Sequence, residues 1–487
     1  MKKIIFRADG NAETGLGHMY RAFALLEMYL DNFDCLLLTK DNSTTSVIPS
    51  HYNYKTIPAG IDIEQEPQWL NENYSAAGTW LFADGYHFTS PYQEAVKGFG
   101  FKLAYVDDLC AWQMYADVVI NHAMNITAGS YKAQPYTAFA LGTRFAILRP
   151  LFIEAAANTA RNTGNANTAL VCFGGADPLN LTFKATQALC NLKSISKIHV
   201  IVGGAYKHSD IFELGKTHPQ LQVHRNIAEA ELVAIMKSCD FGIAPASNIL
   251  YELCAVKMPV LSGYYVENQK NIYKGALEKQ IIFDGGDLAP YTVTDFENKI
   301  TALLAAGNND AFIKNQSALF DGKIKERFLN LLMEITYRKA TAEDVILVFN
   351  WANDPLSRAN SYFSEPIALE THKAWFEKKL LDRHALIYIA EIDNRPAGMV
   401  RYDVSDNDAT VGILVAEDFR GKGLAADLLT GTAQLYFKEH IKPVLAYIKE
   451  ENTASIRSFE KAKYKKLKNE LVHGCKSYVY KLEEHDV

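Results

Sequence analysis

Residues 413–425 read ILVAEDFRGKGLA, and this stretch decides the fold of the last third of the chain. An apolar run typical of a strand leads into the loop Arg420–Gly423, and a helix is expected to begin at Leu424. The two glycines of this loop allow positive φ angles and the close approach of an anion. Backbone N–H groups at a helix start and the helix dipole both favour negative charge. The stretch therefore predicts a strand–loop–helix unit that binds a phosphate.

The residues on either side of this stretch predict an α+β domain over 336–487. Strands are expected at about 385–391, 396–403, 409–415, 444–448 and 478–482, and helices at about 341–353, 369–381, 424–439 and 453–461. We expect an antiparallel sheet with one splayed edge.

The first 330 residues alternate short apolar runs with helical sequence, which is the pattern of βαβ units around parallel sheets. In the first series, strands are expected at 3–8, 35–38, 79–83, 103–106 and 118–120, with a helix at 18–30. In the second, strands are expected at 168–173, 197–202, 241–244 and 260–261, with helices at 181–192, 229–237 and 250–255. Residues 155–167, which are small and polar, are interpreted as a linker. The fold class is therefore α/β, with Rossmann-like domains over 1–158 and 165–330 and a nucleotide cleft at the carboxyl ends of their strands.

Composition narrows the classes of function. The net charge of −6 argues against a nucleic-acid-binding protein. The chain has no apolar run of about 18 residues, so no membrane span is expected. Arg7 and Asp9 interrupt the first apolar run, which is unlike a signal peptide. The seven cysteines include no C-x-x-C pair, so neither a zinc cluster nor a disulfide framework is indicated. We expect a cytoplasmic protein with no nucleic-acid or membrane partner and no metal.

The C-terminal motifs identify a family resemblance. Residues 420–425 have the pattern R-G-x-G-x-A, and Asn452, Ser455, Phe459, Glu460 and Lys461 form a second spaced motif. Over about residues 336–485 the chain resembles the GNAT acetyltransferases, and segments around Trp351 and His372 resemble the subgroup that acetylates amino sugars and ribosomal-protein N-termini. The resemblance implies acetyl-CoA as co-substrate. The residues implied to bind it are Leu414, Val415, Arg420, Gly421, Lys422, Gly423, Leu424, Ala425, Asn452 and Ser455.

One residue departs from the family pattern. Many members carry a tyrosine at the position of Phe459, whose hydroxyl protonates the leaving thiolate, and a phenylalanine has no proton to give. Tyr464, Tyr447 or solvent could take this role. Glu417 or a chain of waters could accept the proton of the amine, although a solvated carboxylate is the simpler interpretation of Glu417. Trp351 and His372 are interpreted as core residues.

Residues 7–18, RADGNAETGLGH, link the first expected strand to the first expected helix. Gly15 and Gly17 would let the backbone approach a phosphate or a sugar. His18 falls at the helix start, where the positive end of the dipole favours the neutral imidazole. A neutral imidazole beside a ligand-binding loop can act as a base. Taken alone, His18 is more simply interpreted as a helix-start residue with a satisfied hydrogen bond.

In the second series, the diglycine Gly174-Gly175 follows a strand. Ser247 and Asn248 can cap a helix whose N-terminus favours a phosphate. Glu252 lies one turn further along, within reach of a ribose diol. A polar loop after the next strand holds Asn268 and Gln269. Each feature taken alone is a cap or turn residue more often than a ligand contact.

Together these segments resemble the UDP-2,4-diacetamido-2,4,6-trideoxy-β-L-altropyranose hydrolases, a family with a GT-B-like fold, over about residues 1–330. The motifs are R-A-D-x₅-G-x-G-H-x-x-R from Arg7, D-x-Y from Asp84, V-D-D from Val106, L-R-P from Leu148, G-G-x-D-P from Gly174, S-N-x₃-E from Ser247, and Asn268-Gln269. Many members have Gly-Gly-Ser where this chain has Pro245-Ala246-Ser247, which leaves the form of the phosphate cradle open.

The hydrolase resemblance implies that water attacks the anomeric carbon and UDP leaves with inversion. It implies catalytic roles for His18, as general base, and for Asn268. The residues implied to bind the substrate are Arg7, Asp9, Gly17, Arg21, Asp84, Tyr86, Gly174, Gly175, Ser247, Asn248, Glu252 and Gln269.

Both resemblances point to consecutive steps of pseudaminic acid biosynthesis. The acetyltransferase would acetylate N4 of UDP-4-amino-4,6-dideoxy-N-acetyl-β-L-altrosamine, and the hydrolase would then release the diacetamido sugar. UDP-amino-sugars are the expected ligands, and other enzymes of the pathway are candidate partners. Channelling between the two activities is a hypothesis. The alternatives are a GT-B glycosyltransferase, a hydrolysing 2-epimerase, a non-enzymatic nucleotide-sugar sensor, and the same pair of activities on a different deoxyamino sugar.

Overall fold

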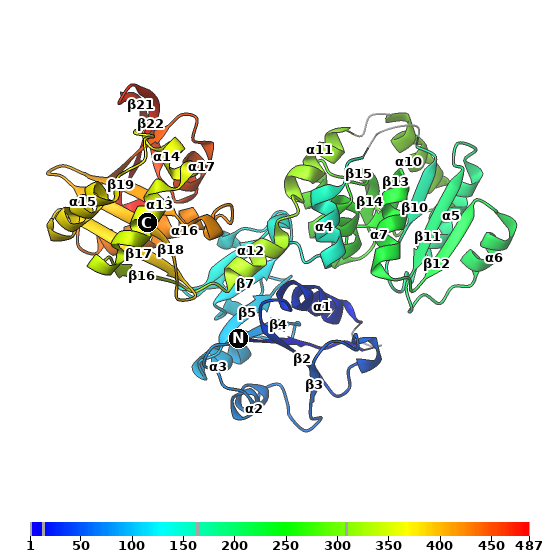
Figure 1. The fold of residues 1–487 in the computed structure, drawn as a ribbon. Coiled ribbons are helices and arrows are strands. Elements are labelled where there is room, and N and C mark those ends of the chain that lie inside the picture. Colours follow the sequence, from blue (N-terminus) through cyan, green and yellow to red (C-terminus); the bar gives the residue numbers. More distant parts are fainter. Residues whose placement is uncertain (1, 12–14, 162–165, 307–309, 487) are drawn as a thin grey trace. The chain divides into compact units, whose positions relative to one another are not determined.

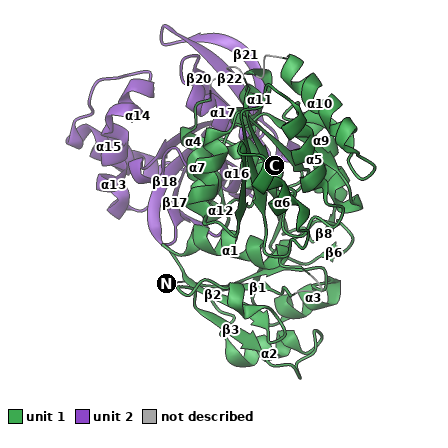
Figure 2. Ribbon diagram, turned by 90° about the vertical axis from the view of Figure 1, so that its right-hand side faces the viewer, with its two compact units in different colours: residues 1–331 green, residues 332–487 purple. Residues whose placement is uncertain are grey.

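A computed structural model describes residues 2–11, 15–161, 166–306 and 310–486. The chain divides into two compact units, residues 1–331 (unit 1) and 332–487 (unit 2), which Figure 2 colours separately. This boundary lies close to the predicted start of the last domain at 336. The predicted division of the first part into 1–158 and 165–330 stays a prediction. Residues 12–14 of the glycine loop and 162–165 of the predicted linker lie outside the described residues.

The first sheet of unit 1 is parallel throughout, and its interior strands are mostly buried apolar runs, which is typical of parallel sheets. Ile4, Ile5 and Phe6 of one interior strand are fully buried. In spatial order its strands are β3 (Tyr54–Ile57), β2 (Asp34–Lys40), β1 (Lys3–Ala8), β4 (Thr79–Asp84), β5 (Lys102–Val106), β7 (Val118–Asn121) and β9 (Ala138–Leu141). The accompanying helices are α1 (Gly17–Tyr29), α2 (Glu66–Asn73) and α3 (Ser90–Gly98) (Figure 1). Strand β6 (Gln113–Met114) pairs with β8 (Lys132–Ala133).

The second sheet of unit 1 is also parallel. Its strands in spatial order are β12 (Leu221–Arg225), β11 (Lys197–Val202), β10 (Thr168–Val171), β13 (Phe241–Pro245), β14 (Val260–Tyr264) and β15 (Phe283–Asp287). The helices of this part are α4 (Pro150–Asn158), α5 (Leu181–Asn191), α6 (Asp210–Thr217), α7 (Glu229–Ser238), α8 (Asn248–Ala255), α9 (Lys270–Glu278), α10 (Val293–Ala306), α11 (Asp310–Leu319) and α12 (Ile324–Leu331).

Each parallel sheet has one point where the strand order reverses. In the first sheet this point lies between β1 and β4, and in the second between β10 and β13. In open α/β sheets, ligands bind outside the carboxyl ends of the strands at such switch points. Asp9, which follows β1, and Asp84, the last residue of β4, lie at the first point, and the loops that carry Gly174 and Ser247 lie at the second. The strand order therefore selects the same loops that the sequence motifs selected.

Unit 2 is built on one mixed sheet with helices on both faces. Its strands in spatial order are β16 (Ile335–Lys339), β17 (Ala385–Ile392), β18 (Arg395–Val404), β19 (Ala409–Val415), β20 (Val444–Lys449), β22 (Cys475–Leu482) and β21 (Lys465–Val472). Its helices are α13 (Val345–Asn353), α14 (Pro355–Asn360), α15 (Leu369–Leu381), α16 (Leu424–Phe437) and α17 (Thr453–Lys461). Alternate strand residues face α16 and α17 on one side, and α13 and α15 on the other, so the sheet has two separate apolar cores.

The splay in this sheet differs from the prediction in its position. We expected a splayed edge, whereas the strands part in the interior, between β19 and β20. These two strands run parallel and pair only through Ala409 with Val444 and Thr410 with Leu445. The rest of β19 has its ladder on one side, with β18. The fully antiparallel sheet that we expected is therefore wrong at this one pairing.

Two further features of unit 1 differ from the sequence interpretation. The predicted linker at 155–167 begins inside a helix, because α4 extends to Asn158 and buries Ala155 and Ala156. Small residues are compatible with a packed helix as well as with a linker, and only packing distinguishes the two. Helix α12, at the end of unit 1, packs against α1, where the Tyr29 hydroxyl donates to the Phe328 carbonyl at 2.6 Å. Among the helices in the described parts of the chain, none is long and apolar enough to cross a membrane.

Candidate active sites

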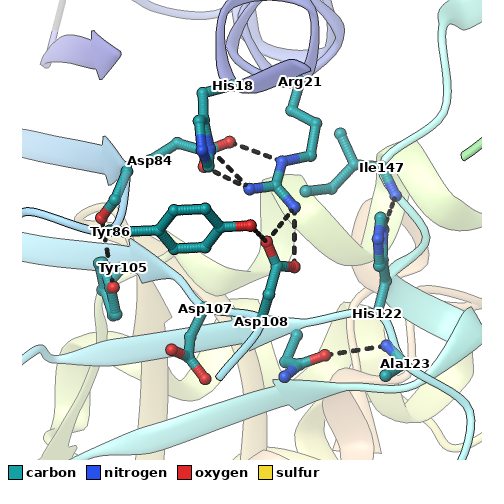
Figure 3. A network of polar contacts seen from close by, with 12 residues as sticks. His18, Arg21, Asp84, Tyr86, Tyr105, Asp107, Asp108, His122, Ala123 and Ile147 are labelled. Carbon is teal, nitrogen blue, oxygen red and sulfur yellow. Dashed lines mark hydrogen bonds and ion pairs between the residues drawn. The ribbon is translucent and has the colours of Figure 1, made fainter. Parts of the chain in front are cut away.

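The first candidate site is centred on His18 at the start of α1. Its Nδ1 lies 2.7 Å from Oδ1 of Asp84, the last residue of β4 (Figure 3). Asp84 is 2% exposed, whereas the His18 side chain is 18% exposed. The tautomer with its proton on Nδ1 makes the shorter contact, to Asp84, which can only accept, although Arg21 Nη2, a donor, also lies 3.0 Å from that nitrogen. That tautomer leaves the lone pair of Nε2 for a water molecule.

Arg21 holds the acid of this pair in place. It donates from Nε and Nη2 to Asp84 at 2.9 and 2.6 Å, and from Nη1 to both oxygens of Asp108 at 2.8 Å. Burial opposes the charge of Arg21, but the two carboxylates raise its pKa, so the guanidinium stays cationic. Burial likewise opposes the charge of Asp108, and Arg21 lowers its pKa. Asp108, from the V-D-D motif, was not among the predicted site residues, although its place at the end of a predicted strand was a signal for it.

Tyr86 forms one wall of the His18 site (Figure 3). Its ring meets the His18 ring edge-on at 4.8 Å, and its hydroxyl lies 3.5 Å from Asp108. Tyr86 is 47% exposed, which is unusual for a large aromatic residue at the end of a buried strand. This arrangement leaves an aromatic surface beside the histidine.

Arg7 of β1 and Asp9, which follows that strand, lie beside the end of β4. Arg7 is fully buried and pairs with both oxygens of Glu66, at 2.7 and 2.9 Å, and with Asp9 at 2.5 Å. A side chain with no exposed surface cannot touch a ligand in this conformation, so direct substrate binding by Arg7 stays a prediction. Sequence reasoning did not find Glu66, because it lies in α2, far from any motif. Gly17, the first residue of α1, has open space where a Cβ would stand.

The second cluster of predicted residues follows β10. Gly174 has φ 85°, and a Cβ on Gly203 would lie 2.7 Å from the Gly175 Cα, so two loops touch through glycines. Asp177 of the same motif caps α5, because its carboxylate accepts from the backbone N–H groups of Leu181 and Thr182 at 3.0 and 2.7 Å. The motif therefore has a structural role besides the predicted contact with the nucleotide.

Four residues from two other motifs also follow strands of the second sheet. Ser247 is the N-cap of α8 and Asn248 is its first residue. Gln269 is 7% exposed and accepts a hydrogen bond from the Tyr265 N–H at 3.0 Å, so it fixes its own loop. Asn268, beside it, is exposed. The exposed member of this pair is the one free to meet a ligand.

Glu252 of α8 lies in an ion pair. Arg149, from the L-R-P motif, donates to its carboxylate at 2.9 Å. Burial raises the pKa of Glu252, and the charge of Arg149 opposes that shift. The predicted ribose contact of Glu252 therefore requires it to keep or exchange this partner, and the contact stays a prediction.

The loop between β19 and α16 has the geometry expected of an anion site. Gly421 and Gly423 have φ 75° and 77°, and no atom of the described residues lies within 4 Å of where the Gly421 Cβ would be. Gly423 is the N-cap of α16, so the first N–H groups of this helix have no acceptor inside it. The loop therefore presents open backbone beside the β19–β20 splay. Leu414 and Val415 end β19 next to the splay, and Leu424 and Ala425 begin the helix.

The side chain of Arg420 is hydrogen-bonded to other residues of unit 2. Its guanidinium donates to Asp354 at 2.6 Å, to the Val415 carbonyl at 2.8 Å and to Ser357 at 3.2 Å. Its own N–H donates to the Glu417 carbonyl. The side chain therefore fixes the end of β19 to α14, and the predicted contact of Arg420 with the co-substrate stays a prediction. Lys422 beside it is exposed, with its ammonium 5.5 Å from the centre of the Phe419 ring.

The other predicted co-substrate residues lie on α17. Asn452 is its N-cap and accepts the Ser455 N–H at 3.1 Å. Phe459 is 2% exposed and packs edge-on against Tyr464 at 4.9 Å. Phe459 is therefore a core residue.

The candidate acids and bases of unit 2 have different environments. Tyr464 is 3% exposed, and burial raises its pKa well above the usual range. Its hydroxyl thus sits in the core, whereas Tyr447 on β20 is only half-buried. Glu417 is exposed. His372 is 2% exposed among the rings of Phe349, Trp375 and Phe376, in agreement with its interpretation as a core residue.

Replacing Asp354 with alanine is expected to destabilise unit 2. The carboxylate accepts from the N–H groups of Leu356 and Ser357, and loss of such a cap costs about 0.5–2 kcal/mol. Burial opposes its charge, but the Ser357 N–H and Arg420 lower the pKa of Asp354. Its contribution is therefore present at neutral pH and is lost as the pH falls through that lowered pKa. Thermal unfolding of the full chain at pH 7 should show a midpoint lower by a few degrees, and the exposed Asp418→Ala serves as control. Equal midpoints for the two variants would contradict the proposed role.

The match to a known domain family lies within unit 2. Residues 334–465 match the family model for the acetyltransferase (GNAT) domain. The chain is 24% identical to an uncharacterized protein of Methanocaldococcus jannaschii, over 96% of this chain and 97% of that one. It is also 24% identical to the UDP-2,4-diacetamido-2,4,6-trideoxy-beta-L-altropyranose hydrolase of Campylobacter jejuni, over 55% of this chain and 94% of that one.

Among solved structures, an aminoglycoside acetyltransferase in complex with coenzyme A and kanamycin matches 31% of this chain and 96% of its own, with 16% identity and a TM-score of 0.29. The chain thus combines a partial similarity to a UDP-sugar hydrolase with a C-terminal GNAT acetyltransferase domain.

Proposed function

We propose that the protein is bifunctional: unit 2 acetylates the 4-amino group of a UDP-amino-sugar, and unit 1 then hydrolyses the product. The proposed first substrate is UDP-4-amino-4,6-dideoxy-N-acetyl-β-L-altrosamine. The proposed final products are UDP and free 2,4-diacetamido-2,4,6-trideoxy-L-altropyranose, with inversion at C1. A GT-B arrangement of the two parallel sheets, with UDP in the cleft between them, belongs to the same proposal.

The observation that carries the hydrolase half is the pairing of His18 with Asp84. A general base must hold a lone pair toward water and must be stabilised when it gains the proton. Asp84 stabilises the imidazolium, and Arg21 keeps Asp84 in place, with 2.6 and 2.9 Å between donors and acceptors. Attack by one activated water on the face opposite UDP inverts the anomeric carbon. Tyr86 lies against His18 and would offer its ring to the sugar.

The proposed nucleotide half lies at the second switch point. The diglycine loop after β10 and the N-terminus of α8 are the groups that would stabilise the diphosphate as it leaves, through backbone N–H donors. Asn268 would help to place the water or the sugar. Glu252 would meet the ribose, in exchange with or beside Arg149. These roles follow the resemblance, and the positions of the residues at strand ends support them.

The observation that carries the acetyltransferase half is the open glycine loop beside the β19–β20 splay. Acetyl-CoA, when bound, supplies the acetyl group as a thioester. The N–H groups at the start of α16 would bind the pyrophosphate, and the unpaired side of β19 at Leu414 and Val415 would align the extended arm. Phe459 has no proton to give, so the half-buried Tyr447 or solvent remains to protonate the thiolate.

The decisive test incubates the full chain with acetyl-CoA and UDP-4-amino-4,6-dideoxy-N-acetyl-β-L-altrosamine and measures free CoA and free UDP over time. We expect CoA first and UDP after it, with no acceptor alcohol added. CoA without UDP would refute the hydrolase half. UDP released only after an acceptor is added would instead indicate a glycosyltransferase, and a sugar altered at C2 would indicate an epimerase.

Replacing Asp84 with asparagine is expected to slow UDP release without changing CoA release. The amide cannot stabilise an imidazolium, and general-base help is worth roughly 10²–10⁴-fold. The matched control is Asp117→Asn. Asp117 also borders a strand of this sheet, but it lies at the amino end of β7 and pairs with Lys97. Single-turnover rates with preformed diacetamido substrate give the comparison. Equal rates for the two variants would remove Asp84 from the mechanism.

A further inference from the structure

A second histidine, His87, lies at the same sheet edge as His18. Ala8 of β1 and Asp84 of β4 are register partners, so the residues that follow them, Asp9 and Gly85, leave the sheet side by side. Tyr86 packs against His18. His87 instead lies beside Asp9, with 3.4 Å between its Nε2 and Asp9 Oδ2. The edge therefore carries two histidine–aspartate pairs.

The position of the His87 ring is fixed by the residues around it. A Cβ on Gly85 would lie 2.8 Å from the Cε1 of His87, so the ring occupies space that only a glycine leaves open. The ring also packs against Phe88, with 4.0 Å between ring centres. The His87 side chain is 41% exposed, so part of it reaches solvent. A ring that is packed this closely and still reaches solvent is positioned to contact a ligand.

Asp9 is held so that one of its oxygens faces this ring. Its Oδ1 accepts from Arg7, from the Lys40 N–H at 2.7 Å and from Thr39 at 3.2 Å. The other carboxylate oxygen, Oδ2, is the one that lies near His87. Burial opposes the charge of Asp9, but Arg7 lowers its pKa, so the group is a carboxylate. A carboxylate beside Nε2 favours the tautomer with its proton there, which leaves Nδ1 as an acceptor. Burial and the charge of Arg7 lower the pKa of His87, which keeps the imidazole neutral.

We propose that His87, oriented by Asp9, is a specificity residue that accepts a hydrogen bond from an N–H or O–H donor on the sugar of the bound nucleotide sugar. The inference rests on the proposed hydrolase function and deepens it. An acetamido sugar offers such amide N–H donors, whereas the diphosphate offers only acceptors. A neutral imidazole acceptor therefore suits the sugar and not the diphosphate, and binding of UDP alone tests whether the ring instead contacts a donor of the uridine.

The test measures equilibrium binding to the full chain in a His18→Ala background, which removes the proposed base. The two ligands are UDP and UDP-2,4-diacetamido-2,4,6-trideoxy-β-L-altropyranose. His87→Phe keeps the ring against Phe88 but removes the acceptor, so we expect a roughly five- to tenfold higher Kd for the nucleotide sugar and an unchanged Kd for UDP. His87→Gln keeps a carbonyl acceptor and should restore part of the affinity.

Two outcomes would overturn the inference: no change for either ligand in His87→Phe, or an equal loss for both, which indicates a contact to phosphate or a general distortion. Failure of the proposed function is separate from these outcomes. If the wild-type chain binds the nucleotide sugar without releasing UDP, the hydrolase proposal fails, while the comparison between His87 variants still decides the sugar contact. If neither the wild-type chain nor the His18→Ala chain binds either ligand, both the hydrolase proposal and the proposed role of His87 are refuted.

Discussion

His18→Ala is expected to lower the rate of UDP release by about 10²–10⁴-fold, the usual worth of general-base catalysis. The effect should fall on the chemical step, because the ring of His18 is small and only 18% exposed, and the aromatic wall of Tyr86 stays in place. Release of CoA from acetyl-CoA should be unchanged, since His18 belongs to unit 1 and the acetyltransferase domain to unit 2. Single-turnover measurements with preformed diacetamido substrate isolate this step.

The matched control is His51→Ala. His51 is 62% exposed, pairs with Glu27 and precedes the amino end of β3, so its loss should leave both activities intact. A full rate of UDP release by His18→Ala would refute His18 as the base. A comparable loss in both variants would point to a general effect on unit 1.

Gly421→Asp is expected to raise the KM for acetyl-CoA by about 10²-fold. The residue has φ 75° and open space where a Cβ would stand, so the new side chain fits but places a carboxylate at the proposed pyrophosphate site. Like charges in contact cost several kcal/mol, and each 1.4 kcal/mol is tenfold in affinity. UDP release from preformed substrate should be unchanged.

Gly421→Asn separates charge from shape in this experiment. Asparagine and aspartate tolerate positive φ about equally, so the neutral variant carries the same backbone strain without the charge. Gly474→Asp is a second control, because Gly474 has φ 78° and open space in the turn between β21 and β22. Equal KM values for Gly421→Asp and Gly421→Asn would show that the pyrophosphate does not lie at this loop.

The sequence predicted the elements that carry the sites more accurately than the contacts within them. Helix α1, strand β4 and strand β19 lie where their apolar patterns placed them, because local periodicity and glycine positions reflect nearby residues. The roles of Arg7 and Arg420 were less accessible. Both were expected to contact ligands, but they are paired with Glu66 and Asp354, which lie 59 and 66 residues away in the sequence.

The splay of the unit 2 sheet shows the same limit. Each strand could be read from its own alternation, but the position of the splay depends on which strands become neighbours. Alternation sets which face of a strand is buried and does not set its partner. The prediction of a splayed edge was therefore wrong in position, although the splay exists between β19 and β20.

By itself, the sequence determined the α/β class, the glycine loop before α16 and the placing of His18 at a helix start. These features depend on residues a few positions apart, whose preferences act on the local backbone. Only the tertiary structure decided that Asp84 orients His18, that Arg21 joins Asp84 to Asp108, and that His87 faces Asp9. Such contacts form where parallel strands that are distant in sequence end at one edge, and no local preference encodes that meeting.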